Sequence, residues 1–279
     1  MIVNETRNIL KKYDKFAKKK FGQNFIMSNG ILEHIIDVAN INKDDIVLEI
    51  GPGIGSLTEY LAINSKQVIA YEIDADMVNI LKETLASYKN VTVVNKDFLE
   101  VDLDEDINKY FNGSTHIKVV ANIPYYITTP ILFKLLENNN ISEMYFMMQK
   151  ELGERLSAKP KTKDYNALSV IANYKADVKI EFDVPRNFFF PSPNVDSVLL
   201  SIKCKENNYD IENSDDFFKF VQSLFSMRRK TIINNLSSSK YNYSKEQVKE
   251  HLIKANLKET ARAEELDLDK IVELYKTFK

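Results

Sequence analysis

The chain has 279 residues, of which 44% are hydrophobic and 28% are charged, and its formal net charge is −2. This length suits one large domain or a main domain with a smaller one, and the composition is that of an ordinary globular protein. A single cysteine excludes a disulfide framework, and the three histidines lack metal-ligand spacing, so we expect no metal site. No apolar run approaches the length of a membrane span, which predicts a soluble, cytoplasmic protein without a membrane partner.

Positive charge is concentrated in two places. Residues 1–30 hold seven Lys or Arg against two acidic residues, and the lysine run 18–20 lies among them. A second cluster, "MRRK" at residues 227–230, lies far away in the sequence. Local basic patches on a nearly neutral protein can bind a polyanion, but either patch alone is explained as well by a solvated helix face.

Strand-like and helix-like segments alternate from residue 45 to about residue 203. The predicted strands are 45–50, 67–74, 91–97, 116–123, 143–150 and 197–204. The predicted helices between them are 56–65, 75–88 and 128–139. Strands that alternate with helices predict an α/β fold with a mainly parallel sheet that is covered on both faces.

The pattern changes beyond the last predicted strand. Residues 206–215 read as a polar linker, and amphipathic helices are predicted at 215–236 and 245–257. We therefore expect a main domain at residues 1–205 and a small helical domain at residues 206–279.

The motif "EIGPGIG" ends the first predicted strand and holds Gly51, Gly53 and Gly55, three of only seven glycines. This concentration indicates a backbone that turns tightly and approaches a ligand. The spacing differs from the dinucleotide motif G-x-G-x-x-G, and Pro52 removes an N–H group that would help to hold a pyrophosphate. Glu72 ends the next strand, where its carboxylate can accept hydrogen bonds from both hydroxyl groups of a ribose. Together these residues indicate a nucleoside cofactor other than NAD.

Asp97 ends the third predicted strand. Its carboxylate can accept a hydrogen bond from an adenine amino group, although a helix N-cap or turn would also explain it. The motif E-x-G-x-G-x-G, Glu72 and Asp97 together resemble the S-adenosylmethionine site of class I methyltransferases. The resemblance implies a Rossmann-like fold, S-adenosyl-L-methionine as cofactor and S-adenosyl-L-homocysteine as product.

The fourth predicted strand continues into "NIPY", residues 122–125. Adenine N6 is a poor nucleophile, and two acceptors on its two N–H bonds would favour a tetrahedral nitrogen and stabilise the developing positive charge. The side-chain oxygen of Asn122 and the carbonyl of Ile123 can be these acceptors, because Pro124 biases the residue before it to an extended conformation. Tyr125 offers a ring on which a splayed-out base can stack. The alternative is a proline-terminated strand with a tyrosine in the core.

Four segments extend the resemblance over nearly the whole chain. The segments 18–26, 122–131, 188–199 and 224–236 are similar to motifs of the KsgA-type small-subunit rRNA adenine dimethyltransferases. The macrolide-resistance methyltransferases of large-subunit rRNA share the front half of the chain. They usually lack the R-R-K-T helix and the P-x-V-D-S form, so they rank second.

The resemblance implies three groups of site residues. The candidates for chemistry and for stacking on the target base are Asn122, Ile123, Pro124, Tyr125 and Phe189. The candidates for cofactor binding are Asn24, Ile26, Gly51, Gly53, Glu72, Asp97 and Asn122. The candidates for RNA binding are Lys18, Lys19, Lys20, Lys161, Arg228, Arg229 and Lys230.

Two of these assignments carry alternatives. Phe188 and Phe190 flank Phe189, so the stacking ring could shift by one residue, or the three rings could pack on the core. Lys161 and Asn166 stand where the family commonly has glycine. Asparagine tolerates a left-handed backbone, so the second change is mild, and the added lysine could contact a phosphate.

The implied activity is the dimethylation of N6 on two adjacent adenosines near the 3′ end of small-subunit (16S) rRNA. The substrate would be rRNA within an immature small ribosomal subunit, and the enzyme would act as a monomer. Residues 1–205 would then be the catalytic methyltransferase domain, and residues 206–279 would bind rRNA. A non-catalytic assembly or transcription factor on the same fold is an alternative from another class, but the intact "NIPY" argues against lost chemistry.

Overall fold

The computed structural model describes residues 1–13, 23–123, 127–206, 209–239, 241 and 243–279. The chain divides into two compact units, one of Met1–Gly153 with Lys179–Cys204 and one of Glu154–Val178 with Lys205–Lys279. The domain boundary that we expected near residue 205 is one of the points where the chain passes from one unit to the other. Residues 154–178, which we expected in the first domain, instead make most of their contacts within the second unit. We describe each unit by itself.

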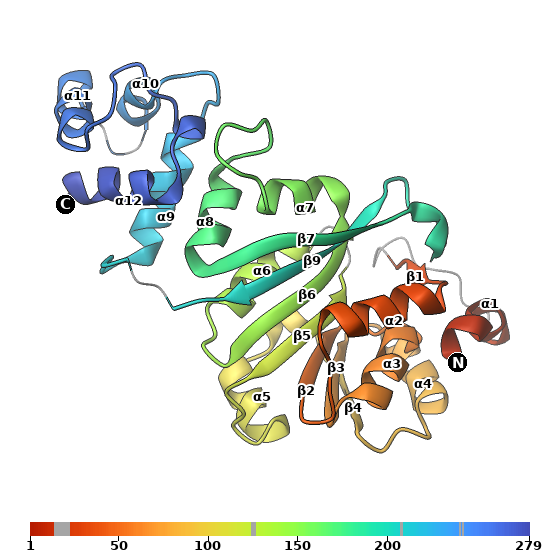
Figure 1. The fold of residues 1–279 in the computed structure, drawn as a ribbon. Helices are drawn as coiled ribbons and strands as arrows, with labels where there is room; N and C mark the ends of the chain where they lie inside the picture. Colours follow the sequence, from red (N-terminus) through yellow and green to blue (C-terminus); the bar gives the residue numbers. More distant parts are fainter. Residues whose placement is uncertain (14–22, 124–126, 207–208, 240, 242) are drawn as a thin grey trace. The chain divides into compact units, whose positions relative to one another are not determined.

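A seven-stranded sheet with the order β4-β3-β2-β5-β6-β9-β7 forms the centre of the first unit (Figure 1). Its strands are β2 (Ile46–Ile50), β3 (Gln67–Glu72), β4 (Val91–Asn95), β5 (Ile117–Asn122), β6 (Ile141–Gln149), β7 (Ala176–Val184) and β9 (Ser197–Cys204). The pairs among β4, β3, β2, β5 and β6 are parallel, and β9 pairs antiparallel with β6. The predicted mainly parallel α/β fold is therefore confirmed. Strand β7 is an addition that the sequence pattern did not predict.

Helices cover both faces of this sheet (Figure 1). The helices of the first unit are α1 (Ile2–Lys12), α2 (Asn29–Val38), α3 (Ser56–Asn64), α4 (Ala75–Thr84), α5 (Leu103–Tyr110) and α6 (Thr128–Leu136). Helices α2 and α3 bury apolar residues against β2, β3 and β5, in a cluster that includes Leu32, Leu61, Val47 and Val68. Such burial of apolar side chains is the main term that stabilises this layered arrangement.

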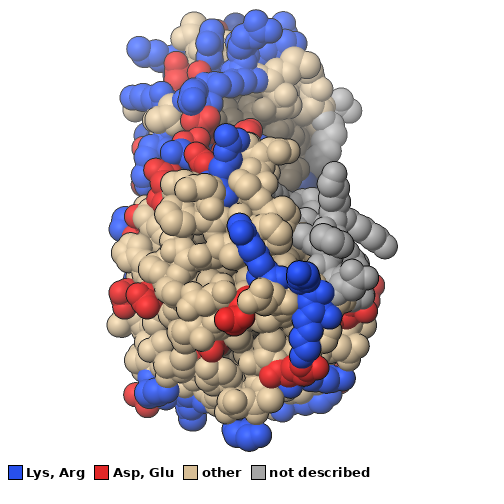
Figure 2. All heavy atoms as spheres, turned by 90° about the vertical axis from the view of Figure 1, so that its right-hand side faces the viewer, with Lys and Arg blue, Asp and Glu red and all other residues tan. Residues whose placement is uncertain are grey.

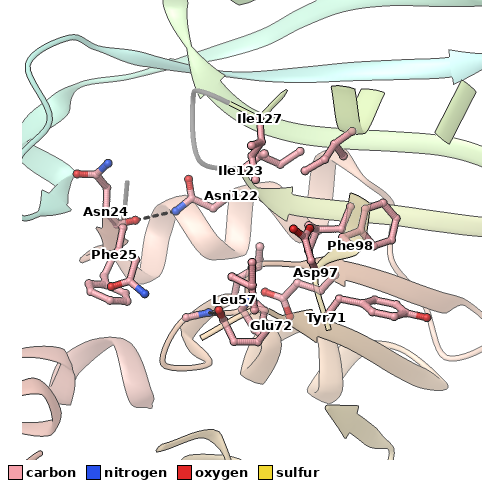
Figure 3. Close-up of a pocket in the computed structure, with 18 of the residues that line it drawn as sticks. Asn24, Phe25, Leu57, Tyr71, Glu72, Asp97, Phe98, Asn122, Ile123 and Ile127 are labelled. Carbon is pink, nitrogen blue, oxygen red and sulfur yellow. Dashed lines mark hydrogen bonds between the residues drawn. The ribbon is translucent and has the colours of Figure 1, made fainter. Parts of the chain in front are cut away.

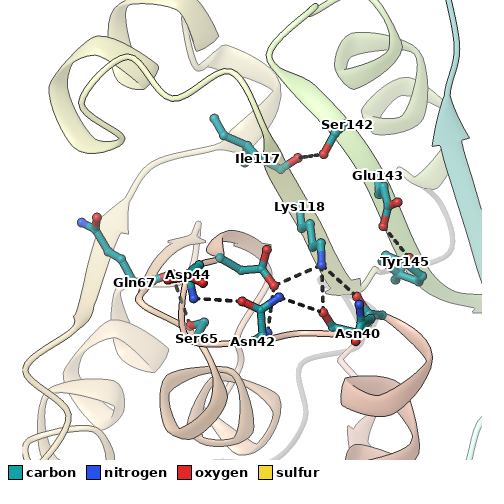
Figure 4. A network of polar contacts seen from close by, with 12 residues as sticks. Asn40, Asn42, Asp44, Ser65, Gln67, Ile117, Lys118, Ser142, Glu143 and Tyr145 are labelled. Carbon is teal, nitrogen blue, oxygen red and sulfur yellow. Dashed lines mark hydrogen bonds and ion pairs between the residues drawn. The ribbon is translucent and has the colours of Figure 1, made fainter.

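Polar residues fix the helix ends. Ser28 accepts from the Ile31 N–H at the start of α2, and Asp102 accepts from two N–H groups at the start of α5. At the amino end of β5, Lys118 Nζ donates to Ala39 O at 3.2 Å and Asn40 O at 2.9 Å, and it pairs with Asp45 at 3.0 Å (Figure 4). This lysine satisfies carbonyls at the carboxyl end of α2 and ties that end to the sheet.

The second unit is mainly helical. After α7 (Lys150–Leu156), which runs into it, its helices are α8 (Ala167–Lys175), α9 (Ser214–Leu224), α10 (Ile232–Ser237), α11 (Lys245–Lys254) and α12 (Leu268–Thr277). Aromatic rings form much of its core: Tyr174, Phe217, Phe220 and Tyr275 are buried, and Phe217 lies 5.2 Å from Tyr275 between ring centroids. Throughout the part of the chain that the structure describes, no helix is long and apolar enough to cross a membrane.

Our prediction of a single helix at residues 215–236 is wrong, because the structure has two helices there, α9 and α10. Thr231 begins α10 by accepting from the Asn234 N–H. The buried Asn235 amide donates to Leu224 O at 2.6 Å and to Met227 O at 3.2 Å, which satisfies carbonyls at the end of α9. Residues 228–230 therefore lie in the turn between the two helices and not on a helix.

Candidate active site

One pocket lies at the carboxyl ends of β2, β3 and β5, where open α/β sheets place their ligands (Figure 3). The structure brings all seven predicted cofactor residues to its lining: Asn24, Ile26, Gly51, Gly53, Glu72, Asp97 and Asn122. They come from the segment after α1, from three strand ends and from the loop after β4.

The glycine loop after β2 can form only with residues that tolerate a left-handed backbone. Gly51, Gly53 and Gly55 have φ values of +71°, +59° and +95°. A Cβ at position 53 would also lie 2.9 Å from a ring carbon of Phe25. The Gly53 N–H donates to Glu72 Oε2 at 3.2 Å, so this loop is attached directly to the carboxylate at the end of β3.

Two buried carboxylates line the same pocket. Burial raises the pKa of Glu72 to about 7, although its carboxylate accepts from the backbone N–H groups of Gly53 and Asp74. Burial also raises the pKa of Glu49 to about 8, and the nearby charge of Glu72 adds to this shift. Perturbed carboxyl groups in a concave site are typical of ligand binding.

Two residues of the pocket lining carry buried polar atoms without a partner among the described residues. Glu49 Oε2 and Ser56 Oγ are buried and have no hydrogen-bond partner among the described residues, and both residues line the pocket. Buried polar groups normally have partners, so these atoms fit a polar ligand. In the sequence, Glu49 had appeared only as the first residue of the glycine motif.

The loop after β4 forms another part of the wall. Asp97 Oδ1 accepts from the Leu99 N–H at 2.9 Å, so the residue caps the short helix η2 (Phe98–Glu100) and lines the pocket as well. Ile73 and Leu99 are large apolar residues that line the pocket and yet stay 48% and 36% exposed. Neither residue was predicted from the sequence. The only signal for them was their position just after a carboxylate at a strand end.

The Asn122 amide has a defined orientation. Its Nδ2 donates to the backbone carbonyl of Asn24 at 2.8 Å, which leaves Oδ1 as the acceptor (Figure 3). The next residue, Ile123, is buried, and its N–H donates to Met147 O at 3.3 Å. The predicted roles of Pro124 and Tyr125 lie outside the described residues.

The aromatic segment after β7 is joined to the "GQNFI" segment. Strands β1 (Phe25–Ile26) and β8 (Phe189–Phe190) pair antiparallel, with Ile26 opposite Phe189. Phe189 is only 4% exposed and belongs to the main apolar cluster, so a base could not stack on it in this arrangement. Phe188 is 36% exposed. Phe188 is therefore the more accessible of these two rings.

Lys161, a predicted RNA-binding residue, is exposed and has a left-handed backbone with φ +68°. This conformation explains why glycine suits the position. Asn166 does not share it: it is extended, at φ −157°, and caps α8 by accepting from the Leu168 N–H. The tolerance of asparagine for a left-handed backbone is therefore not needed at position 166. The lysine run 18–20 lies outside the described residues.

The basic turn of the second unit, residues 228–230, is fully on the surface. Arg228 Nε pairs with Glu264 Oε2 at 2.7 Å, so this arginine has an intramolecular partner. Glu264 also accepts the Lys161 N–H through its backbone carbonyl at 2.8 Å, so the loop and the turn are held side by side. Lys and Arg side chains are dense on the visible face of this unit (Figure 2).

Comparisons with known proteins show which family the chain belongs to. The family model "Ribosomal RNA adenine dimethylase" matches residues 15–279. A protein of Lactococcus lactis subsp. lactis named "Ribosomal RNA small subunit methyltransferase A" is 45% identical over 271 residues, covering 96% of this chain and 92% of that protein. The protein of the same name from Streptococcus gordonii is 48% identical over 267 residues, covering 94% and 92%.

Two solved structures of rRNA-modifying or adenosine-modifying enzymes are also similar to the chain. A dimethyladenosine transferase from Plasmodium falciparum has a TM-score of 0.78 at 27% identity, covering 91% of this chain and 97% of that one. The 23S rRNA methyltransferase ErmE has a TM-score of 0.69 at 26% identity, covering 91% and 98%. The chain therefore belongs to the ribosomal RNA adenine dimethylase family, whose members are methyltransferases that depend on S-adenosylmethionine.

Proposed function

We propose that this protein transfers two methyl groups from S-adenosylmethionine to N6 of each of two adjacent adenosines near the 3′ end of small-subunit rRNA. The observation that carries the proposal is the Asn122 amide, which Asn24 holds with its oxygen as acceptor at the wall of the pocket. The choice of the small subunit is supported by the names of the relatives from L. lactis and S. gordonii.

The pocket residues fit the parts of this cofactor. The Glu72 carboxylate would accept from the ribose hydroxyl groups, and Asp97 would accept from the adenine amino group. Ile73 and Leu99 would contact the adenine ring, and the buried Glu49 would face the positively charged amino group of the methionine part. When bound, the cofactor supplies an electrophilic methyl group on a positively charged sulfur.

The protein's own part in the reaction is mainly positioning. Asn122 Oδ1 and the Ile123 carbonyl would accept from the two N–H bonds of the target amino group and favour a tetrahedral nitrogen. Tyr125 and Phe188 would hold the splayed-out base between their rings. A strong base is unnecessary because the methylated amino group readily loses its proton to water, so the alignment of nitrogen and methyl carries most of the rate.

Basic residues of the second unit would bind the rRNA outside the pocket. Arg229, Lys230 and Lys161 are exposed and can contact phosphates, while Arg228 braces the turn through Glu264. The lysine run 18–20 would add further phosphate contacts. We propose that the enzyme acts as a cytoplasmic monomer on an immature small ribosomal subunit.

The decisive experiment incubates the protein with labelled S-adenosylmethionine and unmethylated small subunits, large subunits or naked rRNA. The modified nucleosides are then mapped. We expect N6,N6-dimethyladenosine at two adjacent positions near the 3′ end of the small-subunit rRNA. Labelling of large subunits alone would favour the second candidate, which rests on the structural similarity to ErmE.

Cofactor affinity is expected to increase with pH around neutrality. Because burial raises the pKa of Glu72 to about 7, much of this carboxyl group is protonated below that pH, whereas the ribose hydroxyl groups donate best to the carboxylate. The contribution of Glu72 to the affinity for S-adenosylhomocysteine should therefore rise by up to about tenfold per pH unit below pH 7 and level off above it. Calorimetric titration across this range measures the effect.

The control for this titration is Glu72→Gln, which cannot ionise. It should bind more weakly and lose the transition near pH 7, while any transition that remains near pH 8 belongs to Glu49. A wild-type profile identical to that of Glu72→Gln would remove Glu72 from the binding mechanism.

Phe188→Ala is expected to lower kcat/KM for rRNA about 5–150-fold, because stacking of a base on an aromatic ring contributes about 1–3 kcal/mol. Cofactor affinity and thermal stability should stay near those of wild type, since this ring lies outside the core. Phe189→Ala should instead mainly lower thermal stability, because its ring is buried. If Phe188→Ala were fully active, the stacking ring would have to be sought elsewhere.

A further inference from the structure

Lys134 lies in the last turn of α6, the helix that follows the "NIPY" segment. Its Nζ donates to Leu99 O at 2.8 Å and to Val101 O at 2.6 Å. The same ammonium group lies 5.9 Å from the centroid of the Phe98 ring. One side chain of α6 therefore makes three contacts with the loop of residues 97–101.

This loop is part of the pocket wall. Asp97, Phe98 and Leu99 all line the pocket (Figure 3). Asp97 caps the amino end of η2 through the Leu99 N–H, and Lys134 binds carbonyls at the other end of the same short helix. The two side chains thus fix the loop from opposite ends.

The Lys134 contacts form in a partly buried place. Burial lowers the pKa of Lys134, with Asp102, Asp97 and Glu137 opposing this shift and Lys96 adding to it. Hydrogen bonds from an ammonium group are stronger than those between neutral groups, and carbonyls that lose their donor in a buried place are costly. Removal of this ammonium would therefore let the loop relax, and Asp97 would move with it.

We propose that Lys134 is a positioning residue for adenine recognition: it holds the 97–101 loop so that Asp97 meets the amino group of the cofactor's adenine. Lys134 belongs to α6, the helix that follows the "NIPY" segment. Its contacts therefore connect the part of the chain that follows "NIPY" with the 97–101 loop. The inference rests on the proposed function, because it takes the pocket as the site of S-adenosylmethionine.

The test compares two ligands that differ at the group read by Asp97. S-adenosylhomocysteine carries the 6-amino group of adenine, and S-inosylhomocysteine carries a carbonyl oxygen there. Wild type should bind the first more tightly. Lys134→Met should lower the affinity for S-adenosylhomocysteine about tenfold, as expected for the loss of a charge-assisted hydrogen bond. It should lower the affinity for S-inosylhomocysteine much less. The ratio of the two affinities should therefore fall.

Two variants separate this role from general stability. Lys134→Arg keeps a charged donor, so its ratio of the affinities for S-adenosylhomocysteine and S-inosylhomocysteine should stay close to that of wild type. Lys118→Met removes another lysine that donates to two backbone carbonyls, Ala39 O and Asn40 O, far from the pocket lining. It should lower the melting temperature but leave the ratio unchanged. Should Lys134→Met fail to fold, Lys134→Gln, which keeps one donor, is measured by the same criteria.

Steady-state kinetics gives a second readout. Lys134→Met should raise KM for S-adenosylmethionine about tenfold while kcat at saturation stays within about twofold, as for the loss of a binding interaction. An unchanged ligand ratio in Lys134→Met, or equal weakening of both ligands, would overturn the inference and leave the proposed function intact. Wild type that binds neither ligand would overturn the proposed function itself, and the inference with it.

Discussion

Asn122→Ala should reduce methyl transfer by roughly 10²–10³-fold, the usual cost of removing one group that stabilises a transition state. The Oδ1 atom of Asn122 is proposed to act on the target nitrogen as positive charge develops there, so its loss falls mainly on kcat. The affinity for S-adenosylhomocysteine should stay within about tenfold of wild type. Single-turnover transfer and calorimetric titration of the same preparation measure the two effects separately.

Asp97→Ala is the matched comparison on the other side of the pocket. Asp97 is proposed to contact only the cofactor, so this variant should bind S-adenosylhomocysteine much more weakly and recover much of its rate at saturating cofactor. A protein with near-normal turnover after Asn122→Ala would refute the proposed chemistry. An equal loss of binding in both variants would make Asn122 a cofactor residue and no more.

Most of the pocket could be predicted from the sequence, because the carboxyl ends of parallel strands meet at one edge of a sheet. Gly51, Glu72, Asp97 and Asn122 each end or follow a strand that is recognisable by its apolar run. Their approach in space therefore follows from the fold class alone. Asn24 was reached only through resemblance, since its place beside Asn122 depends on the β1–β8 pair and no periodic pattern predicts a two-residue strand.

The residues that were missed depend on contacts across the fold. Lys134 reads as an ordinary lysine on an amphipathic helix, and only the structure shows its two bonds to the 97–101 loop. The break between α9 and α10 is similar. A helical pattern runs through the whole segment, but Asn235 reaches back to carbonyls at the end of α9 and Thr231 starts a new helix. The Thr231 cap and the short-range bonds of Asn235 override the helical periodicity there.

The aromatic segment shows why the residue that faces the RNA could not be chosen from sequence. Phe188, Phe189 and Phe190 are chemically identical and adjacent, and their exposure depends on which of them enters a strand. Pairing with β1 turns Phe189 into the core, and Arg7 lies over the ring of Phe190 at 5.2 Å. A shift of one residue exchanges the two faces of a strand, so the register decides the function.

Reversal of the charges of Arg229 and Lys230 to Glu should weaken binding to small ribosomal subunits about 10–50-fold near 0.1 M salt. Both side chains are exposed in the turn between α9 and α10, where they can reach a phosphate backbone. Each lost phosphate contact should reduce the slope of log affinity against log salt by roughly 0.7–0.9. Titration of subunits at several salt concentrations measures affinity and slope together, and cofactor affinity should not change.

Arg228 provides the control within the same turn, because the structure gives it a different role from its neighbour. Its guanidinium pairs with Glu264, so Arg228→Gln should cost little direct phosphate binding but should loosen the link between the turn and the Lys161 loop. We expect a smaller loss of affinity with nearly the wild-type salt slope, and a partial rescue by Arg228→Lys. Equal slopes for wild type and the Arg229/Lys230 reversal would mean that this turn is a solvated surface. An Arg228→Gln slope as shallow as that of the reversal would show that Arg228 itself contacts phosphate and that its ion pair opens on binding.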